Sequence, residues 1–173
     1  MTNDQAEFLL NHVYLPQIKN EQKTTCRVLA AIPADNCDWK PHPTSMSAFE
    51  LAWHIASADC FFLNGVAAGK FESGGSRPET IKTPEDIVNW FNENFAKAFA
   101  AVAALKGDQL TQMIDFHGVF NFPAIAYVGL MSNHSIHHRG QLSAYLRPMG
   151  GKVPAIYGGS ADEPIKMPSA AKA

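Results

Sequence analysis

Helix-start signals recur along this chain, and they predict long helices rather than a sheet. In the segment SAFE at positions 47–50, Ser47 is placed to cap a helix and Glu50 to bond back to the Ser47 amide. In TPED at 83–86, Thr83 is followed by Pro84 at the first helical position and by two acids in the first turn. These signals predict one helix from 47 to about 67 and another from 83 to about 106, where Lys106-Gly107 is expected to end it.

Two further helices are predicted at the ends of the chain. The first runs from about Asp4 to Ala31 with a kink at Pro16, and the last runs from the segment NFP at 121–123 to about Leu146. The segment SGGSRP at 73–78 predicts a long crossover loop, and MIDFHGVF at 113–120 fits a short strand or an extended loop. Four long helices without strand–helix alternation predict an all-α four-helix bundle. One domain is expected over 1–165, followed by a disordered tail at 166–173.

Composition and charge exclude several classes of protein. The hydrophobic fraction of 46% and charged fraction of 17% are ordinary for a globular domain, and a net charge of −2 gives no reason to expect a nucleic-acid partner. No apolar run approaches the roughly 18 residues that cross a bilayer, and the N-terminal sequence does not resemble a secretory signal. The three cysteines show no paired spacing, which favours reduced thiols. We therefore expect a cytoplasmic protein with no membrane or nucleic-acid partner.

The segment NHSIHHRGQ at 133–141 carries three histidines in the last predicted helix. His134 and His138 are four residues apart, so both imidazoles lie on one helical face and can bind one ion. His137 lies about 100° around the helix from His138 and is expected to stay outside that site. The alternative is that the pair only forms hydrogen bonds inside the bundle. Ser135 follows His134, so the glutamate of the HExxH zinc motif is missing.

A catalytic metal usually has three protein ligands and an open position, so a third ligand is needed from another helix. His54, in the middle of the second predicted helix, is the best candidate, although a lone histidine there is more often a hydrogen-bonded core residue. Tyr127 and Arg139 are candidate substrate-binding residues on the last helix. Core packing for Tyr127 and a solvent-exposed position for Arg139 are the alternatives.

The segments WKPHPTSMSAFELAWHIA and NHSIHHRGQLSAYLRPMGGKVPAIYGGSADE together resemble the DinB-like superfamily, from the first helix to Glu163. That superfamily includes metalloenzymes and thiol transferases. The resemblance implies an up-down-down-up bundle with a long crossover between the second and third helices, and frequent homodimers. It also implies a divalent metal, such as nickel or zinc, held by three histidines that correspond here to His54, His134 and His138.

These expectations lead to a functional hypothesis with two alternatives. The lead hypothesis is a metal-dependent enzyme in which the ion activates a low-molecular-weight thiol (glutathione, mycothiol or bacillithiol) or water. The activated group would attack a small electrophile, as in a thiol transferase, an isomerase or a hydrolase. One alternative is a non-catalytic metal-binding, stress-response or small-ligand-binding dimeric bundle, and the other is a bundle without metal. A fourth protein ligand would favour a structural metal, whereas an open position would favour the enzyme.

Overall fold

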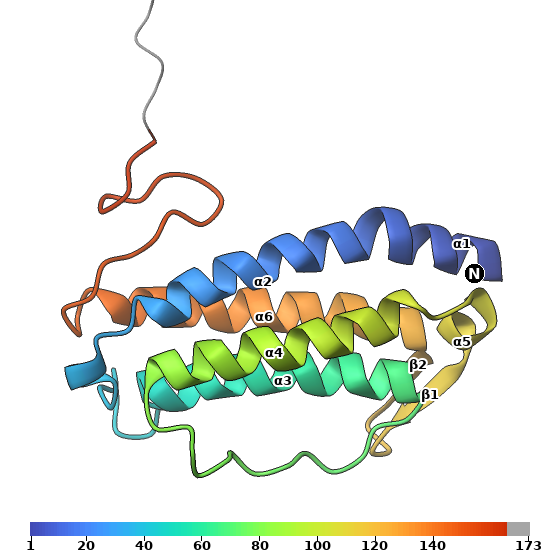
Figure 1. The fold of residues 1–173 in the computed structure, drawn as a ribbon, viewed down its shortest axis with the longest axis horizontal. Helices are drawn as coiled ribbons and strands as arrows, with labels where there is room; N and C mark the ends of the chain where they lie inside the picture. Colours follow the sequence, from blue (N-terminus) through green and yellow to red (C-terminus); the bar gives the residue numbers. More distant parts are fainter. Residues whose placement is uncertain (166–173) are drawn as a thin grey trace, which may run out of the picture.

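Long helices lie side by side in the computed structural model, which describes residues 1–165 (Figure 1). Helix α3 packs against both α4 and α6, and α2 packs against the same two helices, so the core lies between the four. The expected disorder of 166–173 falls outside the described residues. The helices are α1 (Asn3–Leu9), α2 (Leu15–Ala30), α3 (Ala48–Ala68), α4 (Pro84–Ala103), the short α5 (Gly107–Thr111) and α6 (Ala124–Leu146), with a 3-10 turn η2 at Ala34–Asn36.

The first long helix is interrupted where proline was expected to distort it. A π-helical segment, η1 (Leu10–Tyr14), joins α1 to α2 and ends just before Pro16. Proline has no amide hydrogen, and its ring crowds the carbonyl four residues earlier in an α-helix. The wider π turn, in which the Leu15 amide donates to the Leu10 carbonyl, relieves that crowding. The irregularity expected at Pro16 therefore takes the form of a π segment.

The helix starts expected at Ser47 and Thr83 are confirmed. The Ser47 hydroxyl accepts from the Glu50 amide at 3.1 Å, and the Glu50 carboxylate accepts from the Ser47 amide at 2.7 Å. The Thr83 hydroxyl makes the matching contact with the Asp86 amide at 3.1 Å. Both helices therefore begin where side-chain oxygens satisfy backbone amides that lack helical partners.

The expected end of α4 at Lys106-Gly107 is wrong. The helix ends at Ala103, and Gly107 begins α5. A Cβ on Gly107 would lie 2.4 Å from the Asn3 Cβ, so glycine is required there for close packing against α1. A lysine–glycine pair is also typical of a helix end. The residues around Gly107 do not indicate that it packs against Asn3, so the sequence favoured the wrong interpretation.

A small hairpin modifies the expected all-α class. Strands β1 (Met113–Phe116) and β2 (Phe120–Pro123) pair antiparallel, with Phe116 opposite Phe120. His117 (φ 53°) and Gly118 (φ 73°) turn the chain between them. The Val119 amide donates to the Phe116 carbonyl at 2.9 Å and closes a tight turn in which both central residues have positive φ. The strand alternative for this segment is therefore correct, and the fold is mostly helical with one two-stranded sheet. Within residues 1–165, no helix is long and apolar enough to cross a membrane.

Candidate metal centre

The three histidines expected to bind metal come together between α3 and α6. The Nε2 atoms of His54 and His134 are 3.1 Å apart, and one ring nitrogen from each of His54, His134 and His138 lies within 4.8 Å of the other two. All three side chains are partly buried, while His137 is exposed and contacts only the edge of the cluster through the His138 ring. The geometry thus groups the predicted three and leaves His137 outside.

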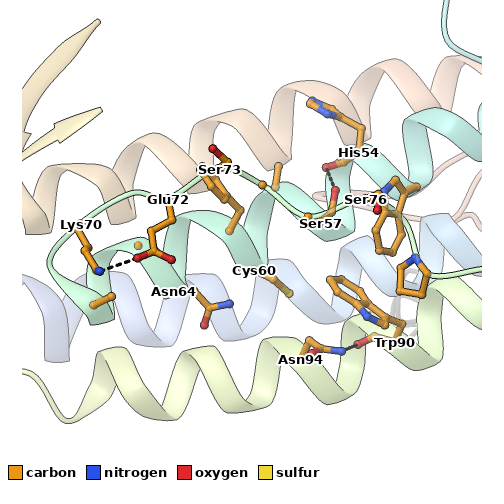
Figure 2. Close-up of a pocket in the computed structure, with 18 residues that line it drawn as sticks. His54, Ser57, Cys60, Asn64, Lys70, Glu72, Ser73, Ser76, Trp90 and Asn94 are labelled. Carbon is orange, nitrogen blue, oxygen red and sulfur yellow. Dashed lines mark hydrogen bonds and ion pairs between the residues drawn. The ribbon is translucent and has the colours of Figure 1, made fainter. Parts of the chain in front are cut away.

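The two helices produce this cluster by different means. On α6, the four-residue spacing stacks His134 and His138 on one face, with ring centroids 4.4 Å apart. On α3, the His54 ring points toward α6 and away from Trp90 on α4 (Figure 2). Close packing of α3 against α6 then closes the gap between residues 80 positions apart in the chain.

Partial burial favours the neutral form of His134 and His54. Desolvation, followed by the nearby His138 and His54 rings, lowers the pKa of His134 to about 4. Desolvation and His138 also lower the pKa of His54. Neutral imidazoles carry the free lone pair that a metal ion needs, so the site favours the ligand form of these side chains at neutral pH.

A glutamine orients one of the three rings. Gln141 Oε1 lies 3.1 Å from His138 Nδ1, and Gln141 Nε2 donates to the Tyr145 hydroxyl at 3.0 Å. When His138 Nδ1 donates its proton to Gln141, its Nε2 keeps a lone pair for the cluster. His134 Nδ1, by contrast, is buried and has no partner among the described residues. Gln141 lies in the segment NHSIHHRGQ, close in sequence to the candidate ligands. Its three-residue spacing from His138 does not by itself predict that it contacts His138 Nδ1.

The donor set fits a small divalent ion. Two nitrogens bound tetrahedrally at zinc distances lie about 3.4 Å apart, close to the 3.1 Å between His54 and His134. Within residues 1–165, no cysteine, aspartate, glutamate or further histidine joins this group of three. Three histidine nitrogen donors without a fourth protein ligand in residues 1–165 match sites that leave one position for water or substrate.

Tyr127 joins α6 to the hairpin. Its side chain is fully buried, and its hydroxyl donates to the Ile114 carbonyl at 2.8 Å and accepts from the Phe122 amide at 3.3 Å. Burial raises the pKa of the Tyr127 hydroxyl. These contacts fix the start of α6, and its role in substrate binding stays a prediction.

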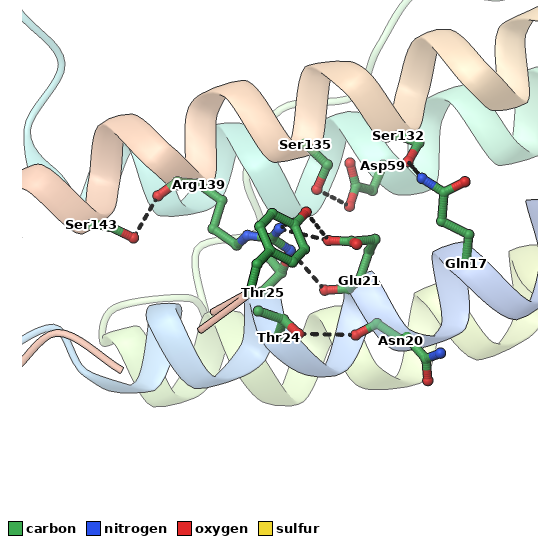
Figure 3. A network of polar contacts seen from close by, with 11 residues as sticks. Gln17, Asn20, Glu21, Thr24, Thr25, Asp59, Ser132, Ser135, Arg139 and Ser143 are labelled. Atoms are coloured by element: carbon green, nitrogen blue, oxygen red, sulfur yellow. Dashed lines mark hydrogen bonds and ion pairs between the residues drawn. The ribbon is translucent and has the colours of Figure 1, made fainter. Parts of the chain in front are cut away.

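Arg139 lies in a buried polar network between α6 and α2 (Figure 3). Its side chain is 1% exposed and pairs with the Glu21 carboxylate at 2.6 Å. It also donates to the Thr25 hydroxyl at 3.2 Å and to the Tyr157 hydroxyl at 2.6 Å. The solvent-exposed alternative for Arg139 is therefore wrong, and its guanidinium is held by α2 and the C-terminal segment. Its proposed substrate role also stays a prediction.

Three other titratable residues, Glu50, Asp59 and His117, lie outside the group of three histidines. Glu50 caps α3, and His117 forms the hairpin turn. Asp59 is 2% exposed; its Oδ2 accepts from the Ser135 hydroxyl at 2.9 Å, and its Oδ1 has no partner among the described residues. Burial raises the pKa of Asp59 to about 8, against smaller opposite effects of Ser135 and Arg139. Asp59 is thus held in the core by Ser135 and is not part of the histidine cluster.

A mostly helical fold with three histidines converging between two helices defines a candidate mononuclear metal-binding protein. The chain belongs to the DinB superfamily, whose sequence profile matches residues 17–142, and the resemblance noted from its motifs is confirmed. The uncharacterised protein YjoA of Bacillus subtilis (strain 168) is 30% identical over 134 residues, which are 76% of this chain and 85% of that protein.

Two crystal structures share the fold. The DinB-like protein YjoA from Bacillus subtilis superimposes with a TM-score of 0.66 at 27% identity, covering 80% of this chain and 92% of that one. A DinB-like protein from Bacillus cereus ATCC 10987 gives a TM-score of 0.71 at 23% identity, covering 83% of this chain and 95% of that one. The second likeness supports the fold alone.

Proposed function

We propose that this protein is a metal-dependent enzyme that joins a low-molecular-weight thiol, or water, to a small electrophile. His54, His134 and His138 would hold one divalent ion, with nickel or zinc the leading candidates. The observation that carries the proposal is the convergence of three histidine ring nitrogens within 4.8 Å without a fourth protein ligand in residues 1–165. A structural zinc site would normally be closed by four protein ligands.

Each part of the chain has a defined task in this proposal. When bound, the ion would act as a Lewis acid that lowers the pKa of a thiol or water. The three histidines supply neutral donors, so the site keeps the positive charge that stabilises a thiolate. Gln141 Oε1 would fix the tautomer and orientation of His138 by accepting a hydrogen bond from His138 Nδ1. No side chain of the described cluster is a general base, so the proton released from the thiol is expected to pass to solvent.

The test is a thiol-dependent activity screen of the metal-loaded protein. Glutathione, mycothiol and bacillithiol are each incubated with 1-chloro-2,4-dinitrobenzene, and release of chloride with formation of the thioether is followed by absorbance. We expect turnover with at least one thiol, lost in His138→Ala and retained in His137→Ala, which alters the exposed neighbour. A water-dependent reaction is tested in parallel with 4-nitrophenyl acetate.

The alternative is a non-catalytic metal-binding, stress-response or small-ligand-binding dimer. Metal bound by the three histidines, with no turnover of any thiol or ester, would favour that alternative. An up-down-down-up order of the long helices, a homodimer and a cytoplasmic location are also proposed from family membership. Exposed Phe8, Phe120 and Phe122 provide apolar surface that a second copy would cover, and the dimer is tested by light scattering.

A further inference from the structure

A pocket of about 580 Å³ lies between the outer face of α3, the side of α4 and the crossover loop at 69–83 (Figure 2). This volume is within the range of sites for small organic ligands. His54 forms part of its border, so the pocket begins next to the candidate metal centre. The pocket extends from there along α3 to Ala68 and across to Asn94 on α4.

The crossover loop is anchored at both ends and arches between them. At its start, Phe71 packs directly over Gly65 of α3, where an added Cβ would lie 2.3 Å from the Phe71 ring. Near its end, the Arg77 guanidinium lies 4.8 Å from the centre of the Phe49 ring. Between the anchors, the glycine pair at 74–75 has open space around it. The pocket therefore lies beneath a span that is fixed at two points and unpacked in its middle.

The lining combines several aromatic rings with polar groups and carries no net charge. Trp53 and Trp90 contact each other with ring centroids 4.7 Å apart, and Phe61 adds a third ring. The only full charges among the lining residues are Lys70 and Glu72, which pair with each other at 2.6 Å. Such a surface favours flat aromatic molecules that can pack on rings and does not select for a charged ligand.

Two carboxamides add hydrogen-bonding capacity. Asn94 Nδ2 donates to the Trp90 carbonyl at 2.8 Å, which leaves its Oδ1 to accept from a ligand. Asn64 is exposed on α3 and forms no side-chain hydrogen bond within residues 1–165, so its donors and its acceptor are both available. The pocket can thus bind the polar edge of a molecule whose faces lie on the indoles.

We infer that the pocket beneath the crossover loop binds an uncharged aromatic molecule with hydrogen-bonding groups at its edge, and that this molecule is the electrophilic substrate. The second part rests on the proposed function, because His54 links the pocket to the metal centre. The first part depends only on the lining residues. Binding and activity can therefore succeed or fail separately.

The test uses a neutral fluorescent probe and its charged counterpart. Purified protein of residues 1–173, free of metal and then loaded with zinc or nickel, is titrated with N-phenyl-1-naphthylamine and separately with the anionic 1-anilinonaphthalene-8-sulfonate. We expect one neutral probe to bind per chain in both forms, at least about tenfold tighter than the anion. Asn64→Trp fills the pocket from an exposed position and is expected to weaken neutral-probe binding about tenfold. That factor corresponds to the loss of one well-packed aromatic contact.

Matched variants separate the pocket from other apolar surfaces. Asn64→Ala tests the same position without filling the pocket and is expected to bind the probe nearly as wild type does. Phe8→Ala removes an exposed ring on α1, outside the pocket, and is expected to have no effect. Loss of binding in Phe8→Ala but not in Asn64→Trp, equal affinity for both probes, or no binding to wild type would each overturn the inference.

The last arm links the pocket to the reaction. In a protein with thiol-dependent turnover, the neutral probe is expected to compete with 1-chloro-2,4-dinitrobenzene and raise its KM without changing kcat. Turnover that is insensitive to saturating probe would overturn the substrate assignment while leaving the proposed function intact. Probe binding without any turnover would refute the proposed function while leaving the pocket as a ligand site.

Discussion

Neutralising the buried Asp59 side chain should change how the stability of this protein depends on pH. The carboxyl is 2% exposed, and burial raises its pKa from an ordinary 3.8 to about 8. Between these two values the folded protein retains a proton that the unfolded chain releases, so stability falls as pH rises. The shift of about four units sets an upper limit of about 6 kcal/mol on the total loss.

The variant Asp59→Asn retains an oxygen that can accept from Ser135 but cannot ionise. Between about pH 5 and pH 7, the free energy of unfolding of wild type should therefore fall relative to the variant by about 1 kcal/mol per pH unit. Other titrating groups, including His54 and His134, are common to both proteins and cancel in the difference. Metal-free protein is used throughout, so that binding of an ion does not add to the profile.

The assay is urea unfolding followed by circular dichroism at a series of pH values. Glu93→Gln serves as the control, because it neutralises a carboxylate on the exposed side of α4 that pairs with Lys97. The difference in the free energy of unfolding between Glu93→Gln and wild type should change much less with pH. Parallel pH profiles for wild type and Asp59→Asn would refute the reasoning, because they would mean that Asp59 ionises alike in the folded and unfolded states.

Three further substitutions test the packing around the site. Gly65→Ala places a Cβ 2.3 Å from the Phe71 ring, so the loop anchor must move; probe affinity in the pocket should fall severalfold while metal binding stays intact. Arg139→Met removes the ion-pair partner of Glu21, which retains the Tyr157 hydroxyl as a donor, and should lower the free energy of unfolding by about 3 kcal/mol in urea titrations. Tyr127→Phe removes the bond to the hairpin and should cost about 1 kcal/mol in the same assay. A change in the KM for the electrophile in Arg139→Met or Tyr127→Phe, at unchanged metal content, would support the predicted substrate role of that residue. A loss of stability below about 0.5 kcal/mol would contradict the stabilising role of the contacts that the variant removes.

The helix starts and the common face of two metal-ligand candidates could be predicted from short stretches of sequence. The capping residues Ser47 and Thr83 act over three positions of the chain, and the structure shows both capping boxes. The spacing of His134 and His138 likewise fixes their common face from the sequence alone. The choice of His54 needed one further step, the expectation that a third ligand must come from another helix. These features are encoded within a few residues or a single helical period.

Features that depend on distant parts of the chain could not be predicted in the same way. The partner of Arg139 is Glu21, 118 residues earlier, and no local pattern connects them. The role of Gly107 depends on its contact with Asn3, 104 residues earlier in the chain. The pocket likewise exists because Phe71 docks on Gly65, which directs the crossover loop over α3. Each of these contacts is set by the path of the chain in three dimensions.

The most direct test of the metal centre is the metal content of the protein and of two single-histidine variants. Wild type, His54→Ala and His137→Ala are loaded with zinc or nickel, desalted and measured by inductively coupled plasma mass spectrometry. We predict about one ion per chain in wild type and His137→Ala, and near zero in His54→Ala, with circular dichroism confirming that all three are folded. Equal metal content in wild type and folded His54→Ala would contradict the central claim that three histidines from α3 and α6 hold one ion.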